Sequence, residues 1–276
     1  MSGILYIVST PIGNLDDITF RAIETLKSVD LILAEDTRHS KHLLDHYQIT
    51  TPSESFHEHN ETDKTQNIIQ RLESGQNIAL ISDAGTPLIS DPGFVLVREA
   101  KNSGLSVVPI PGASALISAL SASGLASNHF KFLGFLPSKQ SARQKIIKAH
   151  QHNQETLIFY ESPKRILASV EDLHKMLGAN RLVCLAKEIT KSFETIITDT
   201  LENLLTHLRA DPAHQKGEFV ILISAVDKKD DIDKIQQLDK IIPILLTEMS
   251  ASKAAKLASK ITGVDKKTCY QIAIES

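Results

Sequence analysis

The chain has 276 residues, a formal net charge of −3 and a sequence pI near 6.4. This length suits one large or two ordinary domains, and the slightly acidic balance argues against a protein that coats naked nucleic acid. No apolar run approaches the roughly 18 residues of a membrane helix, and the amino terminus lacks a basic segment, so we expect a soluble cytoplasmic protein. Cys184 and Cys269 lie far apart, and without a Cys/His cluster of ligand spacing we expect no metal site.

Short apolar runs alternate with helical patterns through the first half of the chain. This alternation predicts a parallel sheet with helices on its faces, forming an α/β domain over residues 1–124. The expected strands are 5–8, 31–34, 78–81 and 107–110, and the expected helices are 19–28, 40–46, 65–73, 94–102 and 114–123.

A short linker at 124–128 leads to a second α/β domain, expected over residues 128–225. Its strands are longer and fit a partly antiparallel, mixed sheet. We expect strands at 130–135, 156–160, 182–188, 194–198 and 219–224, and helices at 141–150, 163–177 and 201–208.

A charged run at 227–231 predicts a linker to a small helical carboxyl-terminal segment, residues 230–276. Helices are expected at 235–248, 252–261 and 265–274, and the break at Thr262-Gly263-Val264 resembles a helix-turn-helix. The segment is either an RNA-contacting surface or a cap that packs on the second domain or on a dimer partner. Two groups of basic residues favour phosphate contact: Lys253, Lys256, Lys260, Lys266 and Lys267, and also Lys139, Arg143, Lys145 and Lys148.

Three strand-to-helix corners carry small residues where a parallel sheet binds ligands. They are 9–15, 82–93 and 109–115, and none contains G-x-G-x-x-G or a Walker loop, so neither a dinucleotide nor a triphosphate is indicated. The corners fit a compact ligand with an adenosine-like body. Asp83 has the chemistry to accept hydrogen bonds from a ribose hydroxyl or an ammonium group. Backbone contacts and shape come from Gly85, Thr86, Pro111 and Ala113.

Charged residues follow two of the expected strands. Glu35, Asp36 and Arg38 come directly after strand 31–34, and Lys187 and Glu188 end strand 182–188. Charge at a strand's carboxyl end is typical of a site in an α/β sheet. The alternative is structural: Asp36 would cap a helix beginning near residue 37, and Arg38 would pair with Glu35.

These segments resemble one family, the tetrapyrrole-methylase-type S-adenosylmethionine-dependent methyltransferases. The resemblance covers most of residues 4–224 and is strongest to the branch that modifies RNA. The porphyrinoid branch looks different at the Ala-Glu-Asp-Thr-Arg segment. The matching segments include Ala-Glu-Asp-Thr-Arg at 34–38, Ser-Asp-Ala-Gly-Thr-Pro at 82–87, Pro-Gly-Ala at 111–113, Tyr-Glu-Ser-Pro at 160–163, Ala-Lys-Glu at 186–188 and Lys-Gly-Glu at 216–218.

The resemblance implies that S-adenosylmethionine lies in the cleft between the two α/β domains. It implies methylation of the 2′-hydroxyl of a cytidine in the decoding region of small-subunit ribosomal RNA, with the small subunit as partner, and we expect a homodimer. The catalytic candidates are Glu35, Asp36, Arg38, Lys187 and Glu188, of which we place Glu35, Arg38 and Lys187 on the acceptor side. The candidates for cofactor binding are Pro11, Gly13, Asp83, Gly85, Thr86, Pro111, Gly112, Ala113, Ser162 and Ala186.

Two other functions remain open at this stage. One is methylation of a tetrapyrrole carbon or another small molecule, and the other is a non-catalytic ribosome-binding factor that has kept the fold. The Ala-Glu-Asp-Thr-Arg segment and the lysine-rich tail favour RNA over a porphyrinoid. The intact small-residue corners favour an enzyme over a binding factor.

Overall fold

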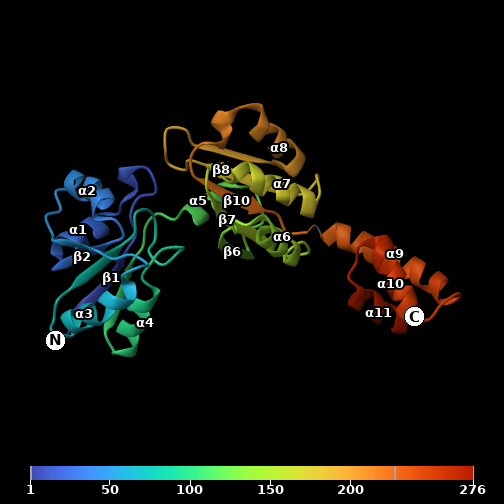
Figure 1. Cartoon of the computed structure of the whole chain (residues 1–276), viewed down its shortest axis with the longest axis horizontal. Helices are drawn as coiled ribbons and strands as arrows, with labels where there is room; N and C mark the ends of the chain where they lie inside the picture. Colours follow the sequence, from blue (N-terminus) through green and yellow to red (C-terminus); the bar gives the residue numbers. More distant parts are fainter. Residues whose placement is uncertain (1, 227, 276) are drawn as a thin grey trace. The chain divides into compact units, whose positions relative to one another are not determined.

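The computed structural model describes residues 2–226 and 228–275, which form two compact units. The larger unit comprises residues 1–149 and 156–224, and the smaller unit comprises 150–155 and 225–276. The larger unit is built around two five-stranded sheets, and the smaller unit contains the helices α9 (Lys228–Leu246), α10 (Ala251–Thr262) and α11 (Lys266–Glu275) (Figure 1).

The first sheet is entirely parallel, as its β-α alternation predicts. Its strand order is β3-β2-β4-β1-β5, so the carboxyl ends of all five strands meet at one edge. The central strands β2 and β4 are buried along their whole length because helices cover both faces. The bounds are β1 (Ile4–Val8), β2 (Leu31–Ala34), β3 (Ser53–Ser55), β4 (Ile78–Ile81) and β5 (Ser106–Ile110).

Four helices form the two layers around this sheet. One cluster of apolar side chains joins α1 and α2 to one face through Leu26 and Leu44, and another joins α3 and α4 to the opposite face through Ile68 and Leu96. Each cluster removes apolar surface from water, which is the main stabilising term of the domain. The bounds are α1 (Phe20–Ser28), α2 (Thr37–His46), α3 (Glu61–Glu73) and α4 (Phe94–Asn102).

The second sheet is mixed, as expected, with order β6-β7-β10-β8-β9. Only the β6–β7 pair is parallel, and the other pairs are antiparallel. Helices α6, α7 and α8 cover one face, and α5 covers the other through Leu116 and Leu120. The bounds are α5 (Ala115–Ala122), β6 (Phe130–Phe135), α6 (Gln140–Ala149), β7 (Thr156–Glu161), α7 (Ile166–Leu177), β8 (Leu182–Lys187), β9 (Thr195–Thr200), α8 (Leu201–Ala210) and β10 (Phe219–Ile223).

Helix α5 links the two sheets. It follows β5 of the first sheet directly in sequence, yet its apolar side chains pack against Ile158 and Val220 of the second sheet. The corner at residues 111–114 is therefore the point where the chain passes from one sheet to the other. A ligand at that corner lies within reach of both.

Several expected boundaries were wrong because polar first turns carry no apolar signal. Helices α2 and α3 begin at Thr37 and Glu61, several residues before their apolar periodicity starts, and the short edge strand β3 was missed. The charged run expected as a linker is also helical where it is described. Lys228 begins α9 (Lys228–Leu246), and residue 227 lies outside the described residues.

The smaller unit has its own apolar core and a helix-turn-helix at its end. Helices α9, α10 (Ala251–Thr262) and α11 (Lys266–Glu275) bury Leu238, Ile242 and Cys269 against one another. Gly263 ends α10 with a φ of 74°, a left-handed conformation that suits glycine. The five lysines that the sequence singled out in this segment are exposed: Lys253, Lys256, Lys260, Lys266 and Lys267. None of the described helices combines the length and apolarity that a bilayer crossing requires.

Arg143 corrects one of the two basic surfaces expected from the sequence. Its side chain is 4% exposed and forms an ion pair with the buried Asp172 at 2.6 Å. Asp172 also accepts hydrogen bonds from Gln140 and Gln144, and Arg143 donates to the Pro137 carbonyl. The residue type was compatible with a phosphate contact, but here the guanidinium ties α6 to α7 in the interior.

We expect Arg143→Ala to lower the free energy of unfolding by about 3–5 kcal/mol, because it leaves the Asp172 carboxylate buried without its cation. Urea denaturation measures the change, and Lys148→Ala on the exposed surface of α6 is the control. A loss below about 1 kcal/mol, the range of a surface ion pair, would contradict this assignment.

Candidate active site

The three small-residue corners meet at the carboxyl edge of the first sheet. Thr10 and Gly85 form a two-way backbone bridge, with N···O distances of 2.9 and 3.1 Å. The Thr86 hydroxyl donates to the Ala113 carbonyl at 3.2 Å and lies 2.9 Å from the Ser9 hydroxyl. These bonds fix the ends of β1, β4 and β5 to one another, so the edge is a single preformed surface.

Two glycines allow this close approach. Gly85 has a φ of 80°, which an L side chain rarely adopts, and it lies next to Ile12 and the Ala113 carbonyl. A Cβ at Gly112 would lie 2.9 Å from the Cβ of Ser9. Larger residues at either position would push the corners apart.

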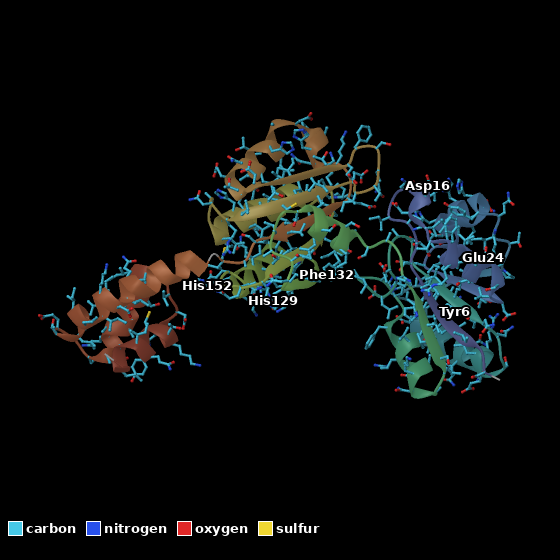
Figure 2. All side chains as sticks on the ribbon, turned by 180° about the vertical axis from the view of Figure 1, so that it is seen from behind. Tyr6, Asp16, Glu24, His129, Phe132 and His152 are labelled. Atoms are coloured by element: carbon cyan, nitrogen blue, oxygen red, sulfur yellow. The ribbon has the colours of Figure 1, made fainter. Side chains whose placement is uncertain are left out.

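A cavity of about 400 Å³ opens at this edge, and both sheets line it. The first sheet contributes loops after β2, β4 and β5, and the second contributes the ends of β7 and β10. The Tyr160 ring in its wall packs edge-on against Phe132 (labelled in Figure 2) and Phe135, at centroid distances of 4.9 and 5.7 Å. The lining includes Ile12, Glu35, Asp83, Gly85, Thr86, Ser90, Asp91, Ser114, Phe135, Tyr160, Glu161, Ser162 and Glu218.

The charged side chains that line this cavity are all acidic among the described residues. Five carboxylates line it, and no lysine, arginine or histidine does so among the described residues. Glu161 pairs with Arg165 at 2.8 Å and Glu218 pairs with Lys191 at 3.0 Å. Within the described part of the chain, Glu35, Asp83 and Asp91 form no ion pair, and no three His, Cys, Asp or Glu side chains are placed to hold a metal ion.

Burial and mutual repulsion perturb two of these carboxylates. The pKa of Glu35 is raised by partial burial and by the Asp83 carboxylate. The pKa of Asp91 is raised from 3.8 to about 6 by burial, then by Glu35 and Asp83, although a hydrogen bond with Ser82 opposes the shift. A perturbed pair of carboxylates in a cleft is a recognised mark of a functional site.

A second cavity of about 440 Å³ adjoins the first. The two share Ile12, Asp83, Ala84 and Glu218, so Asp83 faces both. The second cavity is more basic, since Arg38, His39, His42 and Lys191 line it together with Pro11 and Gly13. The pair of cavities offers room for two ligands with Asp83 between them.

Arg38 and Asp36 form a local unit beside this second cavity. The Asp36 carboxylate caps α2 by accepting from the Arg38 amide, and it pairs with the Arg38 guanidinium at 2.9 Å. Hydrogen bonds from Arg38 lower the pKa of Asp36 to about 2. The expected cap is present, but Arg38 pairs with Asp36 and not with Glu35. The Asp36 amide donates to Asp83 at 3.1 Å, which connects this unit to the first cavity.

The second sheet contributes a buried carboxylate, that of Glu161, to the wall of the first cavity. Glu161 accepts from the Ser162 amide at 2.8 Å and the Ser169 hydroxyl at 2.6 Å, besides its ion pair with Arg165. Arg165 in turn donates to the Ser162 hydroxyl and to the Leu136 carbonyl. This network explains the Tyr-Glu-Ser-Pro segment: it holds the turn after β7 against the loop after β6.

A second polar network connects the two sheets. Lys191 bridges Glu188 at 3.1 Å and Glu218 at 3.0 Å, and Thr190 accepts a hydrogen bond from the Asn14 amide. A Cβ at Gly13 would lie 2.5 Å from Cγ of Lys191. Burial alone would raise the pKa of Glu188, but the Glu218 amide and Lys191 outweigh it and hold that pKa below its usual range. The Glu188 carboxylate is thus engaged by Lys191 and the Glu218 amide.

The structure gathers about half of the predicted site residues around the two cavities. Glu35, Asp83, Gly85, Thr86 and Ser162 line the first, and Pro11, Gly13, Arg38 and again Asp83 line the second. Glu35 lines the first cavity, whereas Arg38, which we expect on the same side of the cleft, lines the second. Asp36, Pro111, Gly112, Ala113, Lys187, Glu188 and Ala186 line neither of these two cavities.

Lys187 and Ala186 lie outside the cleft for identifiable reasons. The Lys187 ammonium donates to the Ala213 carbonyl at 2.7 Å, and Ala186 is fully buried in the sheet core. Asp91, His39 and Lys191 were not expected to face the cavities. Asp91 lies within the segment that the sequence singled out, whereas nothing near Lys191 in the sequence indicates that it contacts Gly13.

This fold, two α/β sheets with a cavity lined by both, matches a known family of enzymes. The family model "Tetrapyrrole (Corrin/Porphyrin) Methylases" matches residues 4–205, and the model "RsmI C-terminal HTH domain" matches residues 234–276. The chain belongs to the tetrapyrrole methylase family.

Curated relatives extend the match to the whole chain. Ribosomal RNA small subunit methyltransferase I of Haemophilus influenzae is 50% identical over 275 residues, covering 99% of this chain and 97% of the relative. The protein of the same name from Escherichia coli O157:H7 is 47% identical over 273 residues, covering 99% and 95%.

Solved structures support the fold. Diphthine synthase superposes with a TM-score of 0.64 at 17% identity, covering 81% of this chain and 90% of that one. Cobalt precorrin-4 methyltransferase superposes with a TM-score of 0.60 at 15% identity, covering 80% and 94%. At these identities the likeness extends to the fold alone.

The raised pKa of Asp91 predicts a gain in stability when its charge is removed. The folded-state pKa of about 6 exceeds the ordinary 3.8, so ionisation opposes folding, and the penalty grows as pH rises between these values. We expect Asp91→Asn to raise the free energy of unfolding by about 1–2 kcal/mol at pH 7.5, because each pKa unit corresponds to about 1.4 kcal/mol and solvent screens part of it.

Urea denaturation at pH 7.5 and at pH 4 checks this prediction, since the gain should shrink as the pH falls. Asp45→Asn, at an exposed carboxylate of α2, is the control. Destabilisation by Asp91→Asn at pH 7.5 would show that the charge is compensated in the folded protein.

Proposed function

We propose that this chain binds S-adenosylmethionine in the first cavity and methylates small-subunit ribosomal RNA, at the 2′-hydroxyl of a cytidine in the decoding region. The observation that carries the proposal is the near-complete match, at 47–50% identity, to proteins named ribosomal RNA small subunit methyltransferase I. The cleft supports it independently, because it offers two adjoining cavities of different charge.

The lining of the first cavity fits this cofactor. When bound, S-adenosylmethionine supplies a methyl group already activated by its sulfonium centre. Backbone around Gly85 and the small residues of the β5 corner would hold the adenosine body. Gly85 and Gly112 keep this edge of the sheet free of side chains. The carboxylates of Asp83, Glu35 and Asp91 suit a ligand that carries positive charge.

The second cavity is the proposed place of the acceptor nucleotide. Arg38, His39 and His42 present nitrogen donors there, and donors of this kind position phosphate and ribose oxygens. Asp83 lines both cavities, and in this proposal its carboxylate would contact both ligands. Holding donor and acceptor in line at fixed distance is the largest contribution that the protein itself makes to methyl transfer.

Methyl transfer from labelled S-adenosylmethionine tests the proposal directly. Three acceptors are compared: small ribosomal subunits, protein-free small-subunit RNA, and a porphyrinoid. We expect label only in RNA, with nuclease mapping showing resistance at one 2′-methylated cytidine. Label in the porphyrinoid supports the small-molecule alternative, and cofactor binding without any transfer supports a non-catalytic ribosome-binding factor.

Gly112→Val should weaken S-adenosylmethionine binding by at least about tenfold while the protein remains folded, because the new side chain displaces Ser9 and the β5 corner. Calorimetric titration measures the affinity. Gly104→Ala is the control. Gly104 has a φ of 70° and lies at the opposite edge of the sheet, with no atom within 4 Å of an added Cβ, so this substitution costs stability without reaching the cavity. Equal affinities in the two variants would remove this corner from the site.

The lysines of α10 generate a prediction about RNA binding. Lys253, Lys256 and Lys260 are exposed and lie three and four residues apart, so they share one face of the helix. Their combined replacement by Gln should reduce the salt dependence of RNA affinity by about 2–3 in the log–log slope, one for each lost phosphate contact. A variant with Lys27, Lys101 and Lys175 replaced by Gln, all exposed on other helices, is the control. An unchanged slope would show that these lysines do not contact phosphate and that α10 serves to pack the smaller unit.

A further inference from the structure

Three of the carboxylates that line the first cavity have no ion-pair partner among the described residues. Glu35 follows β2, Asp83 follows β4, and Asp91 belongs to the loop before α4, so three separate segments bring carboxylates to one space. The other two carboxylates in the lining, Glu161 and Glu218, have basic partners. The imbalance is therefore specific to the part of the cavity formed by the first sheet.

This arrangement is fixed by the fold and is unfavourable by itself. Leu88 and Ser90 in the loop that carries Asp91 have φ values of 73° and 70°, which cost about 1 kcal/mol or more each for residues with a Cβ. The buried Glu61 holds this loop in place, because its carboxylate accepts from the amides of Gly93 and Val95 at 3.0 and 2.9 Å. The chain thus holds a charged group in a half-buried position at a cost in stability.

The groups that face these carboxylates do not supply a cation inside the cavity. Asp83, His57 and His39 surround Glu35, and neither histidine lines the first cavity. Asp91 faces Glu35, Asp83, the Ser82 hydroxyl and Tyr160. No described group of His, Cys, Asp or Glu is arranged to hold a metal ion, so the geometry favours an organic cation.

We propose that Glu35 and Asp91 provide the counter-charge for the sulfonium of S-adenosylmethionine and make the cavity select the cationic donor over its neutral product. This inference rests on the proposed function and deepens it. In the transfer, the sulfur–methyl bond breaks as the oxygen–methyl bond forms, the acceptor hydroxyl loses its proton, and the sulfur becomes an uncharged thioether. Donor and product differ only by the transferred methyl group and the positive charge that it places on sulfur, so a change in their relative affinity when a carboxylate is neutralised reports the effect of charge.

The preference for the donor helps turnover. After transfer the same carboxylates face a neutral thioether, and the attraction that held the donor is gone. The product then leaves a site whose stabilising interaction was present only before the reaction. Glu35, expected from the sequence as a catalytic residue on the acceptor side, becomes a residue that determines which form of the cofactor binds.

Calorimetric titration of the full chain with S-adenosylmethionine and with S-adenosylhomocysteine tests this inference. The variants are Glu35→Gln and Asp91→Asn, which keep the shape and remove the charge, with Glu24→Gln on the exposed surface of α1 (labelled in Figure 2) as the matched control. We expect each cleft variant to weaken donor binding by about tenfold, as expected for loss of one nearby carboxylate in a partly desolvated site, and to change product binding less than about twofold. The double variant should bind donor and product with similar affinity.

The outcomes separate the inference from the proposed function. If the unaltered chain binds neither ligand, the proposed function fails. If it binds both and the cleft variants weaken both equally, the carboxylates act through shape and the charge inference is overturned. Donor affinity that is unchanged in Glu35→Gln and Asp91→Asn also overturns it.

Discussion

Negative charge held without a counter-ion at the carboxyl edge of a parallel sheet constrains the whole cleft. Burial of these carboxylates and, after it, their mutual repulsion raise the pKa of Asp91 to about 6. The surrounding structure holds them in place. Glu61 fixes the loop before α4 through its backbone amides, and the Asp36 amide holds Asp83. In the proposed function, the sulfonium of the cofactor offsets the cost of burying these carboxylates.

The second sheet completes this site by a different means, since its carboxylates at the cleft have basic partners. Glu161 and Arg165 lock the turn after β7, while Lys191 ties β8 to the loop before β10 and lies against Gly13 of the first sheet. The cleft carboxylates of the second sheet are thus ion-paired, whereas those of the first sheet are not. The second cavity, lined by Arg38, His39, His42 and Lys191, adjoins the first, and in the proposed function it takes an acceptor with phosphate groups.

The sequence predicted the architecture well because the spacing of apolar residues shows which strands and helix faces are buried. The buried strands β2 and β4 and the helix α4 fall at the predicted residues, and the mixed second sheet was expected from its longer strands. Boundaries failed where helices begin with polar turns, as at Glu61, whose side chain faces inward to cap another helix. No pattern of polarity distinguishes such a residue from a solvated one.

The site was predicted in part, for a related reason. Residues at strand ends, such as Asp83 and Gly85, could be predicted because a residue that follows a strand in a βα unit lies at the carboxyl edge of the sheet. Arg143 and Lys191 were misjudged or missed because their partners, Asp172 and Glu218, lie 29 and 27 positions away in the chain. Contacts of that kind depend on tertiary packing, and one sequence does not reveal them.

The most direct test of this account is the number of protons exchanged when the cofactor binds. Calorimetric titration at pH 6 in buffers of different ionisation enthalpy gives that number. A cation placed beside Asp91 lowers the pKa of its carboxyl, so S-adenosylmethionine should release about half a proton per molecule bound, and S-adenosylhomocysteine close to none. Equal proton release for the two ligands, or none for either, would contradict the claim that this cleft is built around the positive charge of its donor.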